Sequence, residues 1–348
     1  MGSGGSQKIF VTVKSYSQRG KLLKRADIQT LAESRDLEEL VTRIKNTKYA
    51  DAVSGIEKPY SAEKLENALR VYLADAQFKI AKASGKSKIL DAYFHKFLIT
   101  NLKLILKGKI LGKSQEEIES YFNFHAEELI NQRDVVVKAL VAKDLEEAVS
   151  SLSSSPFSAD ITKAVELYNE TKNTQAFDIY FDKMLYHQIS KAIRSENNQD
   201  ITRIYGRDID FYNIMSIVRG KFWGLDSEKI EDLLVPPTAT TPKHLLDRMV
   251  AAESVKDAID ELSTTKYKSI IPDAEDDVEV LSQFEHALEM GIYKATNASF
   301  SKMFSFATVI GISKLIGYEV RNISATAFAV EQKIPVETTM SKLILNEE

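Results

Sequence analysis

DLEELVTRIKNTKY occupies residues 36–49, and its pattern returns as DLEEAVSSLSSSPF at residues 144–157 and as SVKDAIDELSTTKY at residues 254–267. Each copy opens on aspartate or serine, whose side chain can accept hydrogen bonds from the free amides at a helix start. Apolar residues then recur at spacings of three and four, which predicts a short amphipathic helix with one buried stripe. A hydroxyl residue and, two positions later, an aromatic residue close every copy. Three copies at nearly equal spacing indicate an internal triplication.

A second block of sequence supports the same period. It reads NLKLILKGKILG at residues 101–112, NIMSIVRGKFWG at 213–224 and NISATAFAVEQK at 322–333. The first two copies share a Gly-Lys pair and end on glycine, whereas the third copy has alanine and lysine at the glycine positions. A glycine inside a helix costs about 1 kcal/mol relative to alanine, so Gly108 and Gly220 predict close packing against another helix. The closing glycines are typical of helix C-termini.

The two blocks and the helical patterns between them predict an all-α fold of three similar helical domains in a pseudo-threefold arrangement. The expected domains are residues 7–125, 126–237 and 238–348. Residues 1–6 read Met-Gly-Ser-Gly-Gly-Ser and are interpreted as a linker or the remnant of a tag. A short extended piece is expected only at residues 9–13.

Composition excludes several classes of protein. The 348 residues include only 14 glycines and 7 prolines, which disfavours loop-rich and all-β folds. The chain has no cysteine, which excludes a disulfide framework, thiolate metal ligands and a cysteine nucleophile. A net charge of −4 argues against broad nucleic-acid binding. The most apolar run, residues 303–312, is too short to cross a bilayer, so a soluble, cytosolic protein is expected.

Two stretches of the sequence partly match motifs of catalytic sites, but neither match is complete. Residues 108–114 resemble a phosphate-binding loop, but the glycines are one residue too close together and the preceding pattern is helical. The acidic residues 275–279 could hold magnesium, although a plain acidic helix start explains them more simply. The five histidines are too far apart along the chain to form a ligand pair. No catalytic residue, cofactor or metal site is therefore predicted.

Four segments resemble the C subunit of archaeal-type and bacterial V-type ATP synthases, which corresponds to the d subunit of the eukaryotic proton pump. They are YSQRGKLL at residues 16–23, TKY at 47–49, NLKLILKGK at 101–109 and GYEVRNI at 317–323. The resemblance extends over nearly the whole chain from Ile9 onward. The last segment departs from it, because Ala-Phe-Ala-Val follows where family members often carry Gly-Lys.

The resemblance implies an all-helical, funnel-like, non-catalytic subunit of the central stalk, on the cytoplasmic face of the membrane. Such a subunit receives the foot of the axle, made of subunits D and F, and rests on the membrane c-ring. It passes torque for ion transport and for ATP synthesis or hydrolysis, without a cofactor or nucleic acid, and meets the membrane only through the complex. Two alternatives are an unrelated helical-repeat scaffold and an all-α metal-dependent enzyme.

Basic residues near the second block are the candidate partner interface, with a solvated helix edge as the alternative. The candidates are Lys107, Lys109, Arg219, Lys221 and Arg321.

Overall fold

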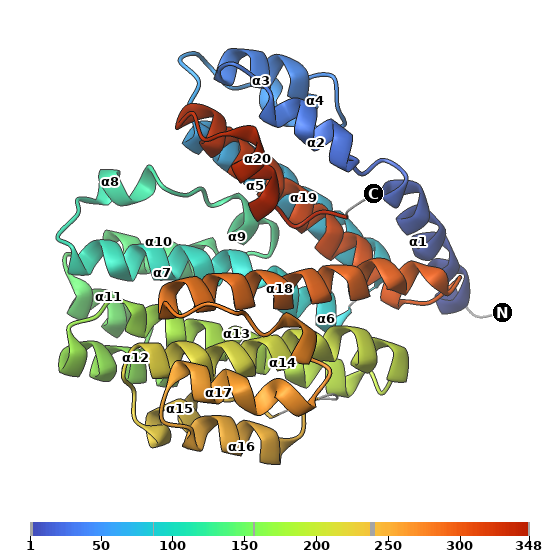
Figure 1. The fold of residues 1–348 in the computed structure, drawn as a ribbon. Helices are drawn as coiled ribbons and strands as arrows, with labels where there is room; N and C mark the ends of the chain where they lie inside the picture. The colour runs from blue at the N-terminus through green and yellow to red at the C-terminus, as the bar shows by residue number, and fades with distance from the viewer. Residues whose placement is uncertain (1–2, 86, 156, 237–240, 347–348) are drawn as a thin grey trace. The chain divides into compact units, whose positions relative to one another are not determined.

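The computed structural model describes residues 3–85, 87–155, 157–236 and 241–346, and every regular element within these ranges is a helix (Figure 1). The predicted all-α fold is therefore confirmed. Residues 9–13 lie within helix α1, Ser3–Arg19, so the extended piece expected there is wrong. Packing of α1 on α5 and α19 outweighs the strand propensity of this β-branched run. Residues 3–6 form the first turn of α1, and Met1 and Gly2 lie outside the described residues.

The helices divide into two compact units, and the first unit combines residues up to 155 with residues from 296 onward. Helix α19 packs on α1, α2, α3 and α5, so the beginning and the end of the chain share one core. Besides α1, its elements are α2 (Arg25–Ala32), α3 (Leu37–Ile44), α4 (Ala50–Ser54), α5 (Ala62–Ser84), α6 (Lys88–Phe94), α7 (Lys96–Ile110), α8 (Gln115–Glu119), α9 (His125–Leu129), α10 (Arg133–Val141), α11 (Leu145–Ser151), η3 (Ser299–Ser301), α19 (Ala307–Glu331) and α20 (Val336–Lys342).

The second unit spans the chain between residues 156 and 295. Phe284 of α18 is fully buried there among apolar side chains of α14, α16 and α17. Its elements are α12 (Ser158–Thr171), α13 (Gln175–Ser195), α14 (Gln199–Phe222), α15 (Ser227–Leu233), α16 (Lys243–Ala251), α17 (Val255–Asp260), η1 (Glu261–Thr264), η2 (Lys268–Ile270) and most of α18 (Asp277–Ala298).

The three sequence repeats do not coincide one to one with these units. Helices of the predicted third domain, 238–348, are shared, because α16 and α17 belong to the second unit and α19 and α20 to the first. The division into three domains at 125 and 237, and their pseudo-threefold arrangement, stay predictions.

The capped helices of the first block form as predicted. They are α3, α11 and α17, and the side chains of Asp36, Asp144 and Ser254 accept the N–H three residues on at 2.9, 2.9 and 3.1 Å. The helix of each second block packs on a capped helix and on the helix before it: α7 on α10 and α11, α14 on α16 and α17, and α19 on α2 and α3. The last second-block helix thus packs on the first capped helix of the chain.

The asparagine that opens each second block is buried, and in two copies it clamps a backbone amide 22 residues further on. Asn213 Nδ2 donates to the Val235 carbonyl at 2.9 Å, and its Oδ1 accepts the Val235 N–H at 3.0 Å. Asn322 makes the same pair of bonds with Ile344, at 2.8 and 3.2 Å. Each clamp fixes the segment that follows the short helix α15 or α20 against the second-block helix.

The first copy varies this clamp. Asn101 Nδ2 donates to the Asn123 carbonyl, again 22 residues on, at 3.1 Å, and also to Glu127 Oε1 at 2.8 Å. Its Oδ1 lies 3.5 Å from a guanidinium nitrogen of Arg70. Side chains thus supply part of the bonding that the backbone supplies in the other two copies.

The glycines inside α7 and α14 allow the close packing that the sequence predicts. A Cβ at Gly108 would lie 2.6 Å from Ile118 Cγ1, and one at Gly220 would lie 2.8 Å from Ile230 Cγ1. Both isoleucines belong to the short helix that follows, α8 or α15. The glycines are therefore required for these helices to pack on their neighbours.

The third copy has alanine at the glycine position and a smaller residue at the isoleucine position. Ala329 and Thr339 stand there, and both are buried. The methyl group that Ala329 adds is offset by the smaller side chain of Thr339. Close-packed contacts tolerate such substitutions best when the total side-chain volume is conserved.

This compensation can be tested with Gly108→Ala. We expect a clash at the upper end of the usual 1–3 kcal/mol range to outweigh the ~1 kcal/mol gain in helix propensity, for a net loss of about 2 kcal/mol. Urea denaturation followed by circular dichroism measures this loss. Adding Ile118→Thr should restore most of the stability.

Gly291→Ala is the matched control, because Gly291 also lies inside a helix but nothing lies within 4 Å of the added Cβ. It should stabilise the chain by up to about 1 kcal/mol. Equal effects of the two alanines would contradict the steric role assigned to Gly108.

Candidate functional site

The lysines of the two Gly-Lys pairs cap the ends of neighbouring helices. Lys109 on α7 donates from Nζ to the carbonyl of Ala142, the C-cap residue that follows α10. Lys221 on α14 donates in the same way to Ala252, the C-cap residue that follows α16. Carbonyls at a helix C-terminus lack partners within the helix, and an ammonium group satisfies them well. Two of the five candidate interface residues therefore bind backbone within their own unit.

The remaining candidates have different surroundings. Arg219 on α14 pairs with Glu285 of α18 at 2.6 Å. Lys107 is half-buried on α7. Arg321 is exposed on α19, with its guanidinium 5.3 Å from the centre of the Tyr318 ring. The five are divided between the units: Lys107, Lys109 and Arg321 lie in the first, and Arg219 and Lys221 in the second.

A buried carboxylate, Glu319 on α19, gathers groups from the first fifty residues. The Tyr49 hydroxyl donates to Glu319 Oε2 at 2.6 Å, the Lys48 amine forms an ion pair with the same oxygen, and the Leu23 N–H donates to Oε1. Burial, and then the negative charge of Glu319, raises the pKa of Tyr49 well above its ordinary value. We call these four residues the Glu319 cluster; it locks the start of the chain onto α19.

The second repeat carries a reduced form of this cluster. Asp210 on α14 stands three residues before Asn213, as Glu319 stands three residues before Asn322. Asp210 Oδ2 lies 3.7 Å from Nζ of Lys266, the middle residue of the second Thr-Lys-Tyr sequence. Sequence reasoning noted the Thr-Lys-Tyr element and the late glutamate separately and missed that they meet.

The remaining repeat has lost both charges together. Leu98 stands three residues before Asn101, and Pro156 occupies the position of the lysine. An unpaired charge at either position would be costly to bury, so a joint replacement is the expected outcome. The acidic residue and the lysine are therefore either both present or both absent in a repeat, and this correlation could have been read from the sequence.

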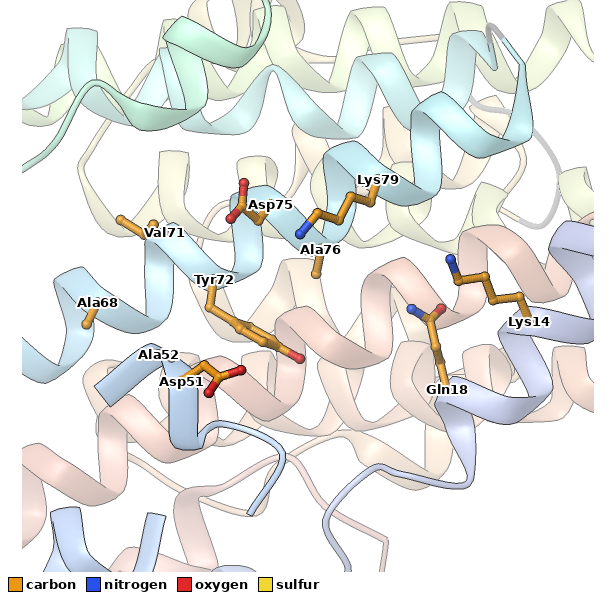
Figure 2. A pocket seen from close by; sticks show the side chains of 10 residues that line it. All are labelled: Lys14, Gln18, Asp51, Ala52, Ala68, Val71, Tyr72, Asp75, Ala76 and Lys79. Atoms are coloured by element: carbon orange, nitrogen blue, oxygen red, sulfur yellow. The ribbon is translucent and has the colours of Figure 1, made fainter. Parts of the chain in front are cut away.

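A pocket of about 580 Å³ lies between α1, α4 and α5 of the first unit. Figure 2 shows the side chains that line it. Lys14 and Lys79 contribute ammonium groups, and Asp51 and Asp75 contribute carboxylates, so the charge of the lining is balanced. Asp75 Oδ1 also lies 2.9 Å from a ring nitrogen of His125. The described lining residues contain neither a histidine nor a serine.

The near-catalytic sequences turn out to be helix starts. Ser114 Oγ accepts the Glu117 N–H at 3.1 Å, and Glu117 accepts the Ser114 N–H at 2.7 Å, which forms the capping box of α8. Asp276 accepts the Glu279 N–H at 3.0 Å at the start of α18, so the acidic helix start is confirmed. Within the described ranges, no group of three or more histidine, cysteine, aspartate or glutamate residues could hold a metal ion.

The fold and the asparagine clamps define an all-helical protein in which the same helix-packing contacts recur along the chain. Comparison with known proteins identifies its family. Residues 11–342 match the ATP synthase (C/AC39) subunit family, and the chain belongs to it. The sequence resemblance to the C subunit of V-type and archaeal-type ATP synthases is thus confirmed.

Three relatives illustrate the similarity, and each is the C subunit of an A-type ATP synthase. The protein from Methanocaldococcus jannaschii is 27% identical over 352 residues, covering 96% of this chain and 86% of the relative. The proteins from Pyrococcus furiosus and Desulfurococcus sp. are 23% and 26% identical, each covering 94% of this chain and 88% of the relative. In the part of the chain that the structure describes, no helix is long and apolar enough to cross a membrane.

Proposed function

We propose that this chain is a non-catalytic subunit of the central stalk of a rotary ATP synthase or ATPase. In this proposal it is a socket that receives the axle subunits D and F and rests on the membrane c-ring, on the cytoplasmic face. It transmits torque between the ring and the ATP-handling head and contacts the membrane only through the complex.

The observation that carries the proposal is the closure of α19 onto the first helices of a chain that belongs to the ATP synthase (C/AC39) family. Helix α19 packs on α1, α2, α3 and α5, and the Glu319 cluster ties it to residues 23–49. A part that transmits torque must resist shear between its helices, and contacts between distant parts of the chain supply that resistance. Catalytic groups are not needed for such a role.

The partner interface is proposed on the basic residues of the second blocks. The proposed contacts are Lys107, Lys109, Arg219, Lys221 and Arg321, of which Arg321 is exposed and the other four are half-buried. Cations at the edge of an interface mainly steer association with an acidic partner.

The decisive test is co-purification. The tagged chain, expressed together with the other subunits of its own ATP synthase, should recover the axle subunits D and F and the c-ring protein from detergent-solubilised membranes. Recovery of neither would contradict the socket role, even though the chain belongs to the family.

Reversing one charge tests the interface separately. We expect Lys107→Glu to weaken binding of the D–F pair about tenfold, which corresponds to ~1.4 kcal/mol. Isothermal titration of the purified chain with the D–F pair measures it. Lys88→Glu is the matched control, because Lys88 is exposed at the start of α6, outside the second blocks. Equal affinities of the two variants would rule out Lys107 as a contact.

A further inference from the structure

The pocket between α1, α4 and α5 owes its room to short side chains, and we call it the α5 pocket. Ala52 of α4 and Ala68 and Ala76 of α5 line it, and all three are half-buried. The lining positions 68, 72, 76 and 79 follow one another at spacings of four, four and three, so they share one face of α5. At about 1.5 Å per residue, the pocket extends along this face for about 16 Å.

Charged groups of both signs face the α5 pocket. Figure 2 shows Lys14 of α1 and Lys79 of α5 pointing into the space between these two helices, and Asp51 pointing into it from α4. All three side chains are exposed, and none of them forms an ion pair with another described residue. Asp75 differs, because its carboxylate lies 2.9 Å from a ring nitrogen of His125. Two ammonium groups and one carboxylate are thus available to a ligand.

The carboxylate and the ammonium of Lys79 belong to different levels along α5. Tyr49, next to the start of α4, contacts Tyr72 with 4.8 Å between the ring centroids, so α4 places Asp51 near the level of Tyr72. Lys79 stands seven residues further along α5, which corresponds to about 10 Å. A ligand that neutralises both groups must therefore be elongated and must carry a positive and a negative charge.

We propose that the α5 pocket binds an extended segment of a partner polypeptide with one acidic and one basic side chain two residues apart. Such side chains point to the same side of an extended chain, about 7 Å apart, and the long lysine side chains reach over the remaining distance. The length of the pocket matches about five extended residues. The Gln18 amide and the Tyr72 hydroxyl also line it and can form hydrogen bonds with peptide groups. The proposal does not depend on the role of the chain in a rotary complex.

Methyl NMR of the full chain tests the site, because alanine methyl groups line the pocket. The chain, labelled with ¹³C at its alanine methyl groups, is titrated with the capped peptides Ala-Lys-Ala-Glu-Ala and Ala-Glu-Ala-Lys-Ala, which present the charges in both directions. We expect the signals of Ala52, Ala68 and Ala76 to shift and to saturate with at least one of them. The signal of Ala258, buried in the second unit, should not move. If neither peptide shifts the pocket signals, the proposal is wrong.

Two further ligands test whether both charges of the peptide are recognised. Exposed ion pairs contribute little individually, so we expect each of the two pairs to change the dissociation constant about threefold. The neutral capped peptide Ala-Gln-Ala-Gln-Ala should therefore bind about tenfold more weakly than the better charged peptide. Equal binding of the neutral peptide would contradict the proposal. Acetate that produces the same shifts with the same affinity would show that the pocket takes a small anion instead.

A variant of the pocket assigns the acidic side chain to its partner. Lys79→Met should weaken binding of the better charged peptide about threefold and leave binding of the neutral peptide unchanged. Lys82→Met is the matched control, because Lys82 is exposed on the same helix but does not line the pocket. It should bind both peptides as the wild-type chain does. If Lys79→Met weakens both peptides equally, or neither, the charge recognition on which the proposal rests is absent.

Discussion

Replacing Glu319 with alanine is expected to lower the free energy of unfolding by about 3–5 kcal/mol, the usual cost of breaking a buried ion pair from one side. The Glu319 side chain is 7% exposed and the Lys48 side chain 17%. Without the carboxylate, the Lys48 ammonium loses its counter-charge, and the Tyr49 hydroxyl and the Leu23 N–H lose their acceptor. Urea denaturation at pH 7, followed by circular dichroism, measures the loss.

A double variant separates the contribution of the ion pair to the free energy of unfolding from the cost of leaving one buried partner unpaired. Glu319→Leu combined with Lys48→Met imitates the repeat in which leucine and proline occupy these positions. Its loss should be well below the sum of the single losses, with a coupling of about 1–3 kcal/mol. Glu253→Ala, at an exposed glutamate between α16 and α17, should change stability by less than about 0.5 kcal/mol. A Glu319→Ala loss as small as that would show that the cluster does not hold α19.

The helix starts were predictable because their signals are local. Asp36, Asp144 and Ser254 cap helices with atoms three residues away, so the sequence alone contains both partners. The close packing at Gly108 and Gly220 was predictable in kind, since a glycine inside a helical pattern needs a reason. The identity of the partner, an isoleucine ten residues on, could be guessed only from its equal offset in two repeats.

The Glu319 cluster could not be assembled from local rules, because 270 residues separate Glu319 from Tyr49. The repeat offers the missing step. Asp210 and Lys266 pair across the same positions, so the closing helix could be inferred to pair its glutamate with Lys48. Such an inference compares the contacts made at equivalent positions of the repeats, and not only the residues that occupy those positions.

The sequence alone does not distinguish the roles of neighbouring basic residues in the candidate interface. Lys107 and Lys109 look alike as a basic stretch, and the sequence does not reveal that the Lys109 amine binds the carbonyl of Ala142. That bond depends on the position of α10, the helix that packs opposite, and hence on tertiary contacts. The extended piece expected at residues 9–13 was wrong for the same reason, because α1 is held as a helix by its packing on α5 and α19.

Asn213→Ala is expected to cost about 2–4 kcal/mol, since it leaves the N–H and the carbonyl of Val235 without their partners and each orphaned buried group costs about 1–3 kcal/mol. Asn213 is fully buried and Val235 is nearly so. The effect should be local as well as global. Amide hydrogen exchange should accelerate at Val235 and its neighbours more than in the middle of α14, because the clamp is what fixes this segment after α15.

Asn169→Ala is the matched control for this clamp, because Asn169 is exposed near the end of α12. Alanine there should change stability by less than about 0.5 kcal/mol or raise it slightly, as its helix propensity is higher. If Asn213→Ala costs no more than this control, water or another side chain must satisfy Val235, and the clamp is not a structural element of the repeat. If the loss is large, Asn322→Ala should reproduce it at Ile344, since the same two bonds form there.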